Sequence, residues 1–304
     1  MTSDILDCLI VGGGPAGLTA AVYLARSRRS LTVVDGGDSR ARWIPTSHNI
    51  PGFPEGVTGE QLLARLRAGA ARYGAPTVQT TATALTHDGE LFHLETEDGP
   101  LRARRAILAC GVEDNEPEAP DGAGVFAAVK KGLLRICPIC DGWESSGLKL
   151  GVIGSCDHAA AEALFLRTYS DRITVIVPRS LGRVTDTRRV ELEAAGMALI
   201  EAEDEALIIH GDRVGCMTIG GEEHTFDVVY AALGSEPKNR LAISAGAALG
   251  EDGRLTVGGR GETSVPGLYA AGDLVHGLNQ VAVATGEAAR AAIAVLNDLE
   301  RNFA

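Results

Sequence analysis

The hydrophobic pattern from Ile5 to Asp35 predicts a strand, a helix and a second strand. Ile5 to Val11 is an apolar run of the kind buried in a parallel sheet. Residues 15–28 then carry apolar side chains at helical spacing, and Leu31 to Val34 form a second apolar run that ends at Asp35. Together these segments predict a βαβ unit.

The same pattern returns about one domain length further along the chain. Lys149 to Ile153 reads as a strand, Ala159 to Thr168 as a helix and Ile173 to Val177 as the next strand. Residues 227–233 add a further apolar strand. The chain therefore holds two βαβ units, which indicates an α/β protein with parallel sheets.

Other segments predict the connecting elements. Thr58-Gly59-Glu60-Gln61 has the form of a capping box and predicts a helix to about Tyr73. Three runs of alternating polarity, 77–86, 91–97 and 101–109, predict short strands. Two polar stretches, 113–124 and 234–237, read as linkers, and an apolar segment at 281–296 predicts a helix.

Composition narrows the class of protein. The 304 residues correspond to about two domains, and a net charge of −12 gives no electrostatic reason to expect nucleic acid or anionic membranes as partners. No apolar run reaches membrane-spanning length. Asp4 and Asp7 stand where a signal peptide would be apolar, so we expect a cytoplasmic protein. Six cysteines are too few for a disulfide scaffold.

The first glycine-rich turn has the spacing of a dinucleotide site. In such a turn, glycines permit the tight turn, the approach of a pyrophosphate and close helix–strand packing, and the helix N-terminus faces the phosphates. Asp35 stands where an acid bonds the adenosine ribose. A purely structural glycine turn is the alternative, and the fingerprint does not separate FAD from NAD. The turn residues are Gly12, Gly14, Pro15, Ala16 and Gly17.

Cys137-Pro138-Ile139-Cys140 has the spacing of a redox dithiol, and Pro138 suits the first turn of a helix. A zinc site needs more ligands, but no second CxxC exists, and His158 and His210 are not suitably spaced. No metal site is therefore predicted. A structural disulfide and two inert thiols remain as alternatives. Asp141 follows directly, where a carboxylate is favoured by a helix N-terminus.

Motifs along nearly the whole chain resemble the low-molecular-weight thioredoxin reductase family. The matching segments, besides the glycine turn and Cys137 to Gly142, are His48 to Gly52, Ala109 to Gly111, Thr263 to Gly267, Gly272-Asp273 and Asn279 to Val281. The resemblance implies FAD at the first turn, a homodimer and a rotation between domains. It also implies that Cys140 lies against the flavin, that Cys137 attacks a partner disulfide, and that Asp141 is the general acid/base.

The resemblance assigns further residues to the cofactor. It places Asn49 near the flavin ring, Asp273 at the ribityl chain, and the Gln280 segment over the pyrimidine end of the ring. The full set implied to bind the cofactor outside the glycine turn is Asp35, Asn49, Gly111, Gly272, Asp273, Gln280 and Val281.

The predicted architecture is α/β, with two Rossmann-like three-layer domains, the second inserted into the discontinuous first. Residues 1–114 and 237–304 form an FAD-binding domain, and residues 115–236 form an inserted NAD(P)H-binding-like domain that carries the dithiol. The predicted activity is FAD-dependent thiol–disulfide oxidoreduction through Cys137 and Cys140. The expected partner is a thioredoxin-like protein or a small dithiol or disulfide.

The second glycine turn departs from the family pattern. It reads Gly154-Ser155-Cys156-Asp157-His158-Ala159, so Cys156 replaces the glycine that admits a pyrophosphate, and Asp157 adds negative charge. The basic cluster after the next strand is reduced to Arg179 and Arg183. NADPH is therefore a weakened candidate as electron donor.

Three alternatives to an NADPH-fed reductase stay open. Trp143 and Glu144 extend the dithiol motif into one similar to that of flavin-dependent dithiol oxidases, which pass electrons to oxygen. Asp141 stands where those enzymes carry histidine, which favours the reductases. A reductase fed by another donor, such as ferredoxin, is the second alternative. A flavin-bound redox sensor with little turnover is the third, and the intact dithiol argues against it.

Overall fold

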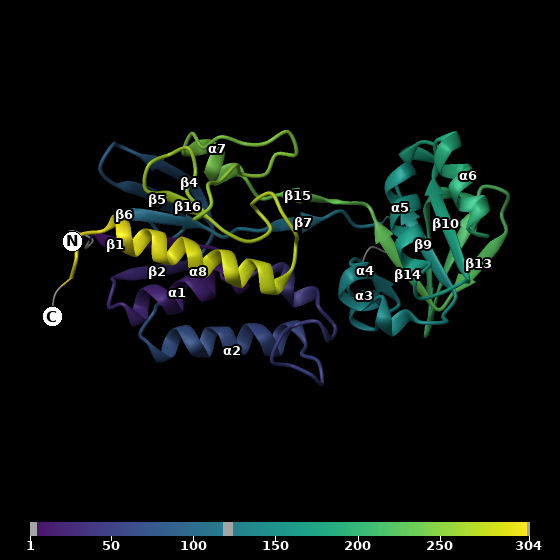
Figure 1. Cartoon of the computed structure of the whole chain (residues 1–304), viewed down its shortest axis with the longest axis horizontal. Coiled ribbons are helices and arrows are strands. Elements are labelled where there is room, and N and C mark those ends of the chain that lie inside the picture. The colour runs from purple at the N-terminus through teal and green to yellow at the C-terminus, as the bar shows by residue number, and fades with distance from the viewer. Residues whose placement is uncertain (1–4, 118–123, 303–304) are drawn as a thin grey trace. The chain divides into compact units, whose positions relative to one another are not determined.

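The chain divides into two compact units in the computed structural model, which describes residues 5–117 and 124–302 (Figure 1). Unit 1 comprises Met1–Arg42, Thr58–Glu113 and Glu236–Ala304. Unit 2 comprises Trp43–Val57 and Asp114–Ser235. Each unit is built around its own sheet, so each is described by itself below.

Unit 1 contains a parallel sheet with the strand order β3-β2-β1-β6-β16. Strands β4 and β5 add an antiparallel meander to the N-terminal half of β6. The central strand β1 is buried because its apolar side chains are covered on both faces of the sheet. The strands are β1 (Leu6–Val11), β2 (Leu31–Asp35), β3 (Thr77–Gln79), β4 (Ala82–His87), β5 (Phe92–Thr96), β6 (Leu101–Leu108) and β16 (Leu268–Ala270).

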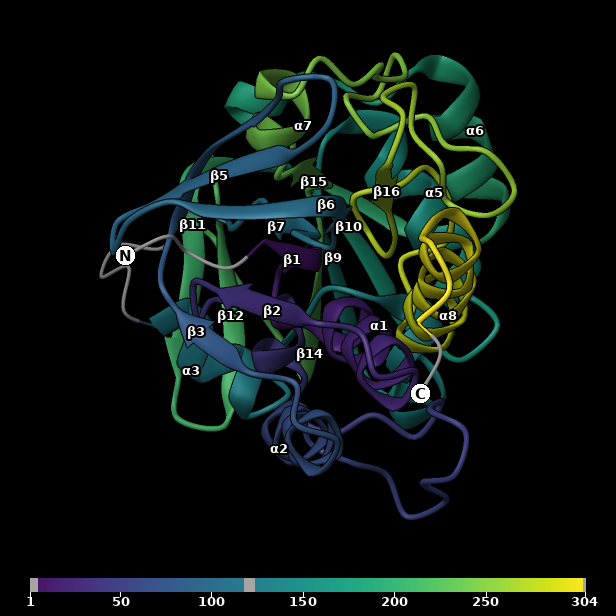
Figure 2. The ribbon, with the colours of Figure 1, turned by 90° about the vertical axis from the view of Figure 1, so that its left-hand side faces the viewer.

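Helices α1 (Pro15–Arg26), α2 (Gly59–Arg72) and α8 (Val281–Asp298) lie on the same side of strands β1 and β2 (Figure 2). Helix α1 packs against both of the others. On the other face, an apolar core unites the sheet with the meander and with α7 (Arg240–Ser244). Full burial of each large apolar side chain there contributes about 1.5–3 kcal/mol.

Unit 2 repeats this plan with the strand order β13-β12-β11-β10-β9-β14-β8. Strands β11, β10, β9, β14 and β8 run parallel to one another, whereas β12 is antiparallel to β11 and β13 is antiparallel to β12. The strands are β8 (Leu134–Arg135), β9 (Leu150–Gly154), β10 (Ile173–Pro178), β11 (Ala198–His210), β12 (Arg213–Thr218), β13 (Glu223–Phe226) and β14 (Val228–Ala232).

The helices of unit 2 flank this sheet. Helices α5 (Cys156–Leu166) and α6 (Asp186–Ala194) contribute to one apolar core, and α3 (Gly124–Lys130) contributes to the other. The short helix α4 (Pro138–Asp141) begins directly after Cys137. The predicted α/β fold with parallel sheets is therefore confirmed.

Two sequence predictions of local structure were wrong. Residues 77–86 form two strands rather than one: β3 pairs with β2, and β4 pairs with β5 after a break at Thr80. The segment expected to be a return linker, 234–237, contains β15 (Ser235–Pro237), which pairs with β7 (Val112–Asp114). Of the other expected linker, 113–124, residues 118–123 lie outside the described residues. Within the described part of the chain, no helix is long and apolar enough to cross a membrane.

Candidate redox site and nucleotide turns

Two glycines of the first glycine turn, Gly12 and Gly17, pack so closely against backbone that a side chain at either position would displace it. Gly12 has a φ of 115°, and a Cβ added there would lie 2.2 Å from the carbonyl oxygen of Ala109. A Cβ on Gly17 would lie 1.9 Å from the oxygen of Gly12, so Gly17 lets α1 approach β1. Gly14 is the N-cap of α1, and no side chain caps this helix. The first backbone N–H groups of α1 thus remain available to an anion.

Several residues implied to bind the cofactor gather at one edge of unit 1. The turn, Asp35 and Gly111 follow the carboxyl ends of β1, β2 and β6, which are parallel neighbours. Asp35 is buried; its carboxylate accepts a hydrogen bond from the Gly37 N–H at 2.9 Å and forms an ion pair with Arg67 at 3.2 Å. Ligands of open α/β sheets bind at this edge.

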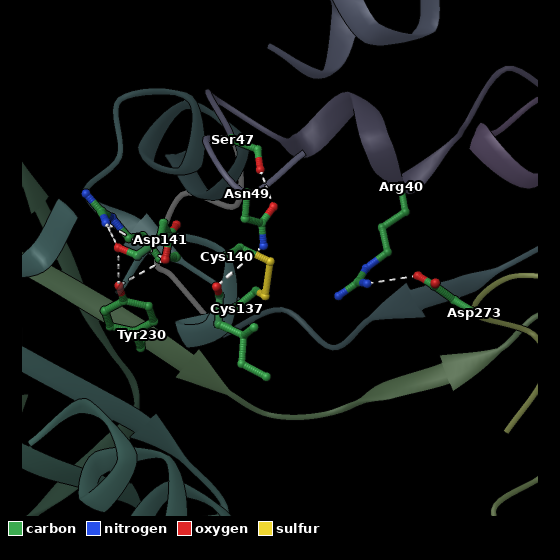
Figure 3. Close-up of a disulfide and its surroundings, with 10 residues drawn as sticks. Arg40, Ser47, Asn49, Cys137, Cys140, Asp141, Tyr230 and Asp273 are labelled. Atoms are coloured by element: carbon green, nitrogen blue, oxygen red, sulfur yellow. Dashed lines mark hydrogen bonds and ion pairs between the residues drawn. A yellow bond between two sulfur atoms is a disulfide. The ribbon is translucent and has the colours of Figure 1, made fainter. Parts of the chain in front are cut away.

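The C-terminal segment reaches the same edge. Gly272 lies against the turn, since a Cβ added to it would be 3.1 Å from the Cβ of Ala16. Asp273 forms an ion pair with Arg40 at 2.9 Å (Figure 3). Gln280 is the N-cap of α8, and Val281 is its first residue. The structure thus brings Gly272 and Asp273 to the first turn, while their roles toward a cofactor stay predictions.

Cys137 and Cys140 form a disulfide at the start of α4. Cys137 is the N-cap, Pro138 occupies the first helical turn, and the Cys140 N–H donates to the Cys137 carbonyl at 2.9 Å. Both cysteines are half-buried. Trp143 is 78% exposed beside them. The predicted pairing of the two cysteines is confirmed.

Asp141 occupies a mainly buried polar cluster in unit 2. Its Oδ1 accepts a hydrogen bond from the Tyr230 hydroxyl at 3.0 Å and lies 3.8 Å from Nη1 of Arg135 (Figure 3). Burial, aided by the nearby Glu144, raises the pKa of Asp141 to about 6, although Arg135 and Tyr230 act to lower it. A carboxyl group that titrates near pH 6 can donate or accept a proton close to neutrality.

Asn49 lies beside α4 within unit 2. Its side-chain amide donates to the Ile139 carbonyl at 3.5 Å, and its Oδ1 accepts from the Ser47 hydroxyl at 2.8 Å (Figure 3). Close by, His48 pairs with Glu144 at 2.8 Å. The structure thus places Asn49 at the dithiol helix, and its predicted place near a flavin ring stays a prediction.

The second turn is built differently from the first. It follows β9, and a Cβ on Gly154 would lie 2.2 Å from the Ala232 oxygen, so this glycine serves strand packing. Helix α5 begins at Cys156, with Ser155 as N-cap. The Asp157 carboxylate accepts hydrogen bonds at 3.1 Å from the backbone N–H and the hydroxyl of Thr185. That bonding holds the Asp157 carboxylate in the first turn of α5, where its negative charge disfavours the binding of an anion.

Sequence reasoning missed the groups that surround Asp141. Arg135, Ser145 and Tyr230 come from three separate elements, and none belongs to a recognised motif. The sequence did hold one sign of these groups: Arg135 follows the apolar Leu134, and Tyr230 stands within the apolar run of β14. A polar group buried in such a run requires hydrogen-bond partners. Within 5–117 and 124–302, no group of three or more Cys, His, Asp or Glu is arranged to hold a metal ion.

Comparison with known proteins adds independent evidence. Residues 6–288 match the family described as pyridine nucleotide-disulphide oxidoreductase. The chain is 32% identical over 303 residues to a thioredoxin reductase from Mycolicibacterium smegmatis, covering 96% of each chain.

Solved structures show the same fold. The crystal structure of HlmI superimposes with a TM-score of 0.87 at 31% identity, covering 96% of this chain and 92% of HlmI. A thioredoxin reductase from Streptococcus pyogenes MGAS5005 also gives 0.87, at 23% identity, covering 98% and 99% of the two chains.

Proposed function

This chain belongs to the pyridine nucleotide-disulphide oxidoreductase family and is a thioredoxin-reductase-like flavoprotein disulfide oxidoreductase, and on that premise we propose that it exchanges electron pairs with a thioredoxin-like protein or a small dithiol or disulfide. The observation that carries the proposal is the Cys137–Cys140 disulfide at the start of α4, with Asp141 as the next residue.

The residues of unit 1 fit FAD. No side chain caps α1 at the turn from Gly12 to Gly17, and Asp35 ends the neighbouring strand, so a pyrophosphate and a ribose would each find a partner. We propose that Asp273, Gln280 and Val281 hold the remainder of the cofactor. FAD, when bound, supplies the two-electron carrier of the reaction.

The two cysteines carry out the thiol chemistry. In the dithiol form, Cys137 attacks one sulfur of the partner disulfide, which forms a mixed disulfide and releases a partner thiolate. Cys140 then attacks the Cys137 sulfur, which restores the Cys137–Cys140 disulfide and releases the second partner thiolate. One disulfide has been reduced and one formed, and the two protons of the Cys137 and Cys140 thiols end on the partner.

Asp141 moves these protons in the proposed reaction. Its pKa of about 6 leaves a fraction of the carboxyl protonated near neutral pH. The protonated carboxyl gives its proton to a departing thiolate, and the carboxylate takes a proton from an attacking thiol. We propose this role for Asp141 because it adjoins Cys140 and lies in the mainly buried polar cluster described above.

The second turn favours a second candidate function, dithiol oxidation by oxygen. Asp157 holds negative charge at the start of α5, and Arg179 pairs with Glu203 at 3.9 Å. Both features disfavour a nucleotide that carries a 2′-phosphate. A reductase that draws electrons from another donor, such as ferredoxin, follows from the same observation. The homodimer and the cytoplasmic location expected from the sequence stay predictions.

An anaerobic titration of the purified flavoprotein with NADPH separates these functions. We expect NADPH to bleach the oxidised-flavin absorbance slowly and only in excess, while a small dithiol bleaches it fully. Rapid stoichiometric bleaching by NADPH would contradict the inferred weakness of the second turn and support an ordinary thioredoxin reductase. Bleaching by a dithiol, followed by recovery of the absorbance in air, would favour the oxidase.

A further inference from the structure

A continuous network of hydrogen bonds surrounds Asp141, and the sheet of unit 2 assembles it. Strands β8 and β14 are parallel neighbours, and their register places Tyr230 opposite Arg135. Helix α4 supplies Asp141, and the 3-10 turn that follows (Trp143–Ser145) supplies Ser145. Tyr230 and Ser145 are fully buried. Arg135, Ser145 and Tyr230, from three elements, thus meet Asp141, the residue next to the dithiol; Figure 3 shows Tyr230 beside Asp141.

The distances and the charge of the carboxylate together favour one direction for this network. Nη1 of Arg135 donates to the Ser145 hydroxyl at 2.9 Å and to the Asp141 carbonyl at 2.7 Å. The Ser145 and Tyr230 oxygens are 2.7 Å apart, and either could be the donor by distance alone. The Tyr230 hydroxyl also lies 3.0 Å from Oδ1 of Asp141 and 3.2 Å from the Asp141 carbonyl oxygen. Because an ionised carboxylate is a stronger acceptor than a neutral hydroxyl or carbonyl, the single hydroxyl hydrogen of Tyr230 goes to Oδ1, and Ser145 donates to Tyr230.

The two oxygens of Asp141 therefore differ. Oδ1 accepts from Tyr230 and is the oxygen that pairs with Arg135. Within the described residues, Oδ2 takes part in no side-chain hydrogen bond or ion pair. A proton added to the carboxyl group would compete with the Tyr230 donor at Oδ1 and meets no such competition at Oδ2. Oδ2 is thus the oxygen at which a proton can come and go.

We propose that Tyr230 is a positioning residue for the dithiol reaction: it anchors Asp141 through Oδ1, backed by Ser145 and Arg135, and reserves Oδ2 for proton exchange with the cysteines. This inference rests on the proposed role of Asp141. Tyr230 is suited to the task because burial raises the pKa of its hydroxyl well above the usual value, so it remains a donor throughout the working pH range.

The other charged groups around Asp141 do not replace this anchor. Glu144, on the following turn, raises the pKa of Asp141, and it is itself paired with His48 at 2.8 Å. Helix α5 also packs against α4. Its titratable residues Asp157, His158 and Glu162 are not among the groups that shift the pKa of Asp141, which are Arg135, Tyr230 and Glu144 besides burial. Tyr230 and Arg135 are therefore the groups that favour the ionised carboxylate.

The test follows reduction of the Cys137–Cys140 disulfide by dithiothreitol in the full-length protein, from about pH 5 to about pH 9. Quenching by alkylation measures the fraction reduced, and each rate is divided by the fraction of dithiothreitol present as thiolate. A dithiothreitol thiolate attacks the disulfide and releases one protein thiolate, which takes the proton of Asp141. The second dithiothreitol thiol then completes the two-electron reduction.

We expect the wild-type rate per thiolate to fall as pH rises through about 6, where Asp141 loses its proton. In Tyr230→Phe, loss of the donor raises the pKa of Asp141, so this fall should move up by about half to one pH unit. The rate on the acidic side should drop about threefold to tenfold because the carboxyl group is no longer held in place. Asp141→Asn should remove the fall altogether.

Tyr169→Phe is the matched control. It removes a phenol hydroxyl in the same unit, from a ring that lies beside Gly142 and whose hydroxyl makes no hydrogen bond to a described side chain. Its profile should coincide with that of the wild type. Ser145→Ala interrupts the chain between Arg135 and Tyr230, and it should shift the profile in the same direction by a smaller amount. Ser145→Ala carries the test alone if Tyr230→Phe does not fold.

A Tyr230→Phe profile that coincides with the wild type would overturn the proposal. So would a wild-type profile that Asp141→Asn leaves unchanged, because Asp141 would then move no proton. The assay uses no NADPH, thioredoxin or oxygen. If the protein showed no catalytic turnover with NADPH, with thioredoxin or with oxygen, the proposed function would be contradicted. The role of Tyr230 in the reduction by dithiothreitol would still be tested by the pH profiles.

Discussion

Each of the two glycine turns joins the first strand and the helix of its βαβ unit, but the two turns differ in which glycines they contain. Gly12 follows β1 and Gly154 ends β9, and a Cβ on either would lie 2.2 Å from a carbonyl oxygen of a neighbouring chain segment. Two positions later, Gly14 is retained in the first turn, and Cys156 stands in the second. The fold requires the first glycine of each turn, whereas a ligand requires the second.

The contrast extends to the helices that follow. Neither helix has a side-chain cap, but α1 starts three residues after Gly12 with no acidic residue in its first turn, whereas α5 starts two residues after Gly154 and carries Asp157 there. Asp157 is bonded to Thr185, so its charge is fixed in place. The N-terminus of α1 therefore has no negative side chain to repel an anion, whereas the first turn of α5 carries a carboxylate that would repel one.

The largest expected effect comes from giving the first turn the residue of the second. In Gly14→Cys, the backbone already has φ and ψ that any residue adopts, and the new Cβ would meet Ser39 Oγ at 3.2 Å. The fold should survive, but the side chain would stand where the pyrophosphate approaches. We expect FAD affinity to fall at least about 100-fold, or about 2.7 kcal/mol. Fluorescence titration of the apoprotein measures this loss.

Gly69→Ala provides the control for that change. Gly69 lies inside α2, and a Cβ there would meet Val22 only at 3.9 Å. Its FAD affinity should equal that of the wild type. If Gly14→Cys retained its flavin at wild-type affinity, the second glycine would not be a ligand requirement, and the comparison between the turns would lose its meaning.

The reverse exchange should have a smaller effect. Cys156→Gly combined with Asp157→Asn restores the glycine and removes the negative charge, while Asn can still accept the hydrogen bonds from Thr185. We expect NADPH to bind about tenfold more tightly, or by about 1.4 kcal/mol. Equilibrium titration with NADPH under anaerobic conditions measures the change. Unchanged binding would place the defect elsewhere, for example at Arg179 and Arg183.

The smallest expected effect concerns the carboxyl group that unit 2 buries. Because the pKa of Asp141 is raised in the folded state to about 6, the folded protein binds more protons than the unfolded chain between about pH 4 and 6. Stability from this group therefore falls as pH rises through that window and stays low above it. Asp141→Asn should stabilise unit 2 by about 1 kcal/mol at pH 8 and by little at pH 4.

Urea unfolding followed by tryptophan fluorescence checks this prediction, since both tryptophans, Trp43 and Trp143, belong to unit 2. A variant that is less stable than the wild type at pH 8 would show that hydrogen bonds to the charged carboxylate outweigh its burial.

Local patterns predicted much of unit 1 because neighbouring residues determine them. The βαβ unit from β1 to β2 was predicted within about two residues, and the capping box at Thr58 is present with both of its hydrogen bonds. The split near Thr80 was missed because β3 and β4 have partners far away in the chain. Alternation shows that a segment is a strand, but it does not show which strand it pairs with.

In the candidate site, as in the fold, the residues that are neighbours in sequence were predictable and the distant one was not. The dithiol and Asp141 form one contiguous motif, so the sequence identifies them together. Tyr230 lies 89 positions from Asp141 and reaches it only through the register of β14 beside β8. That register depends on the whole sheet, and no local pattern of residues reveals it.

The last segment of the chain has a consequence for synthesis on the ribosome. Strand β16 and helix α8 complete unit 1, and α8 packs against α1, which is translated before unit 2. The apolar side of α1 must therefore wait until α8 has emerged, by which time all of unit 2 has been made. A nascent chain halted before α8 would present that apolar surface to chaperones, so we expect C-terminal truncation to cause aggregation rather than release of a stable smaller protein.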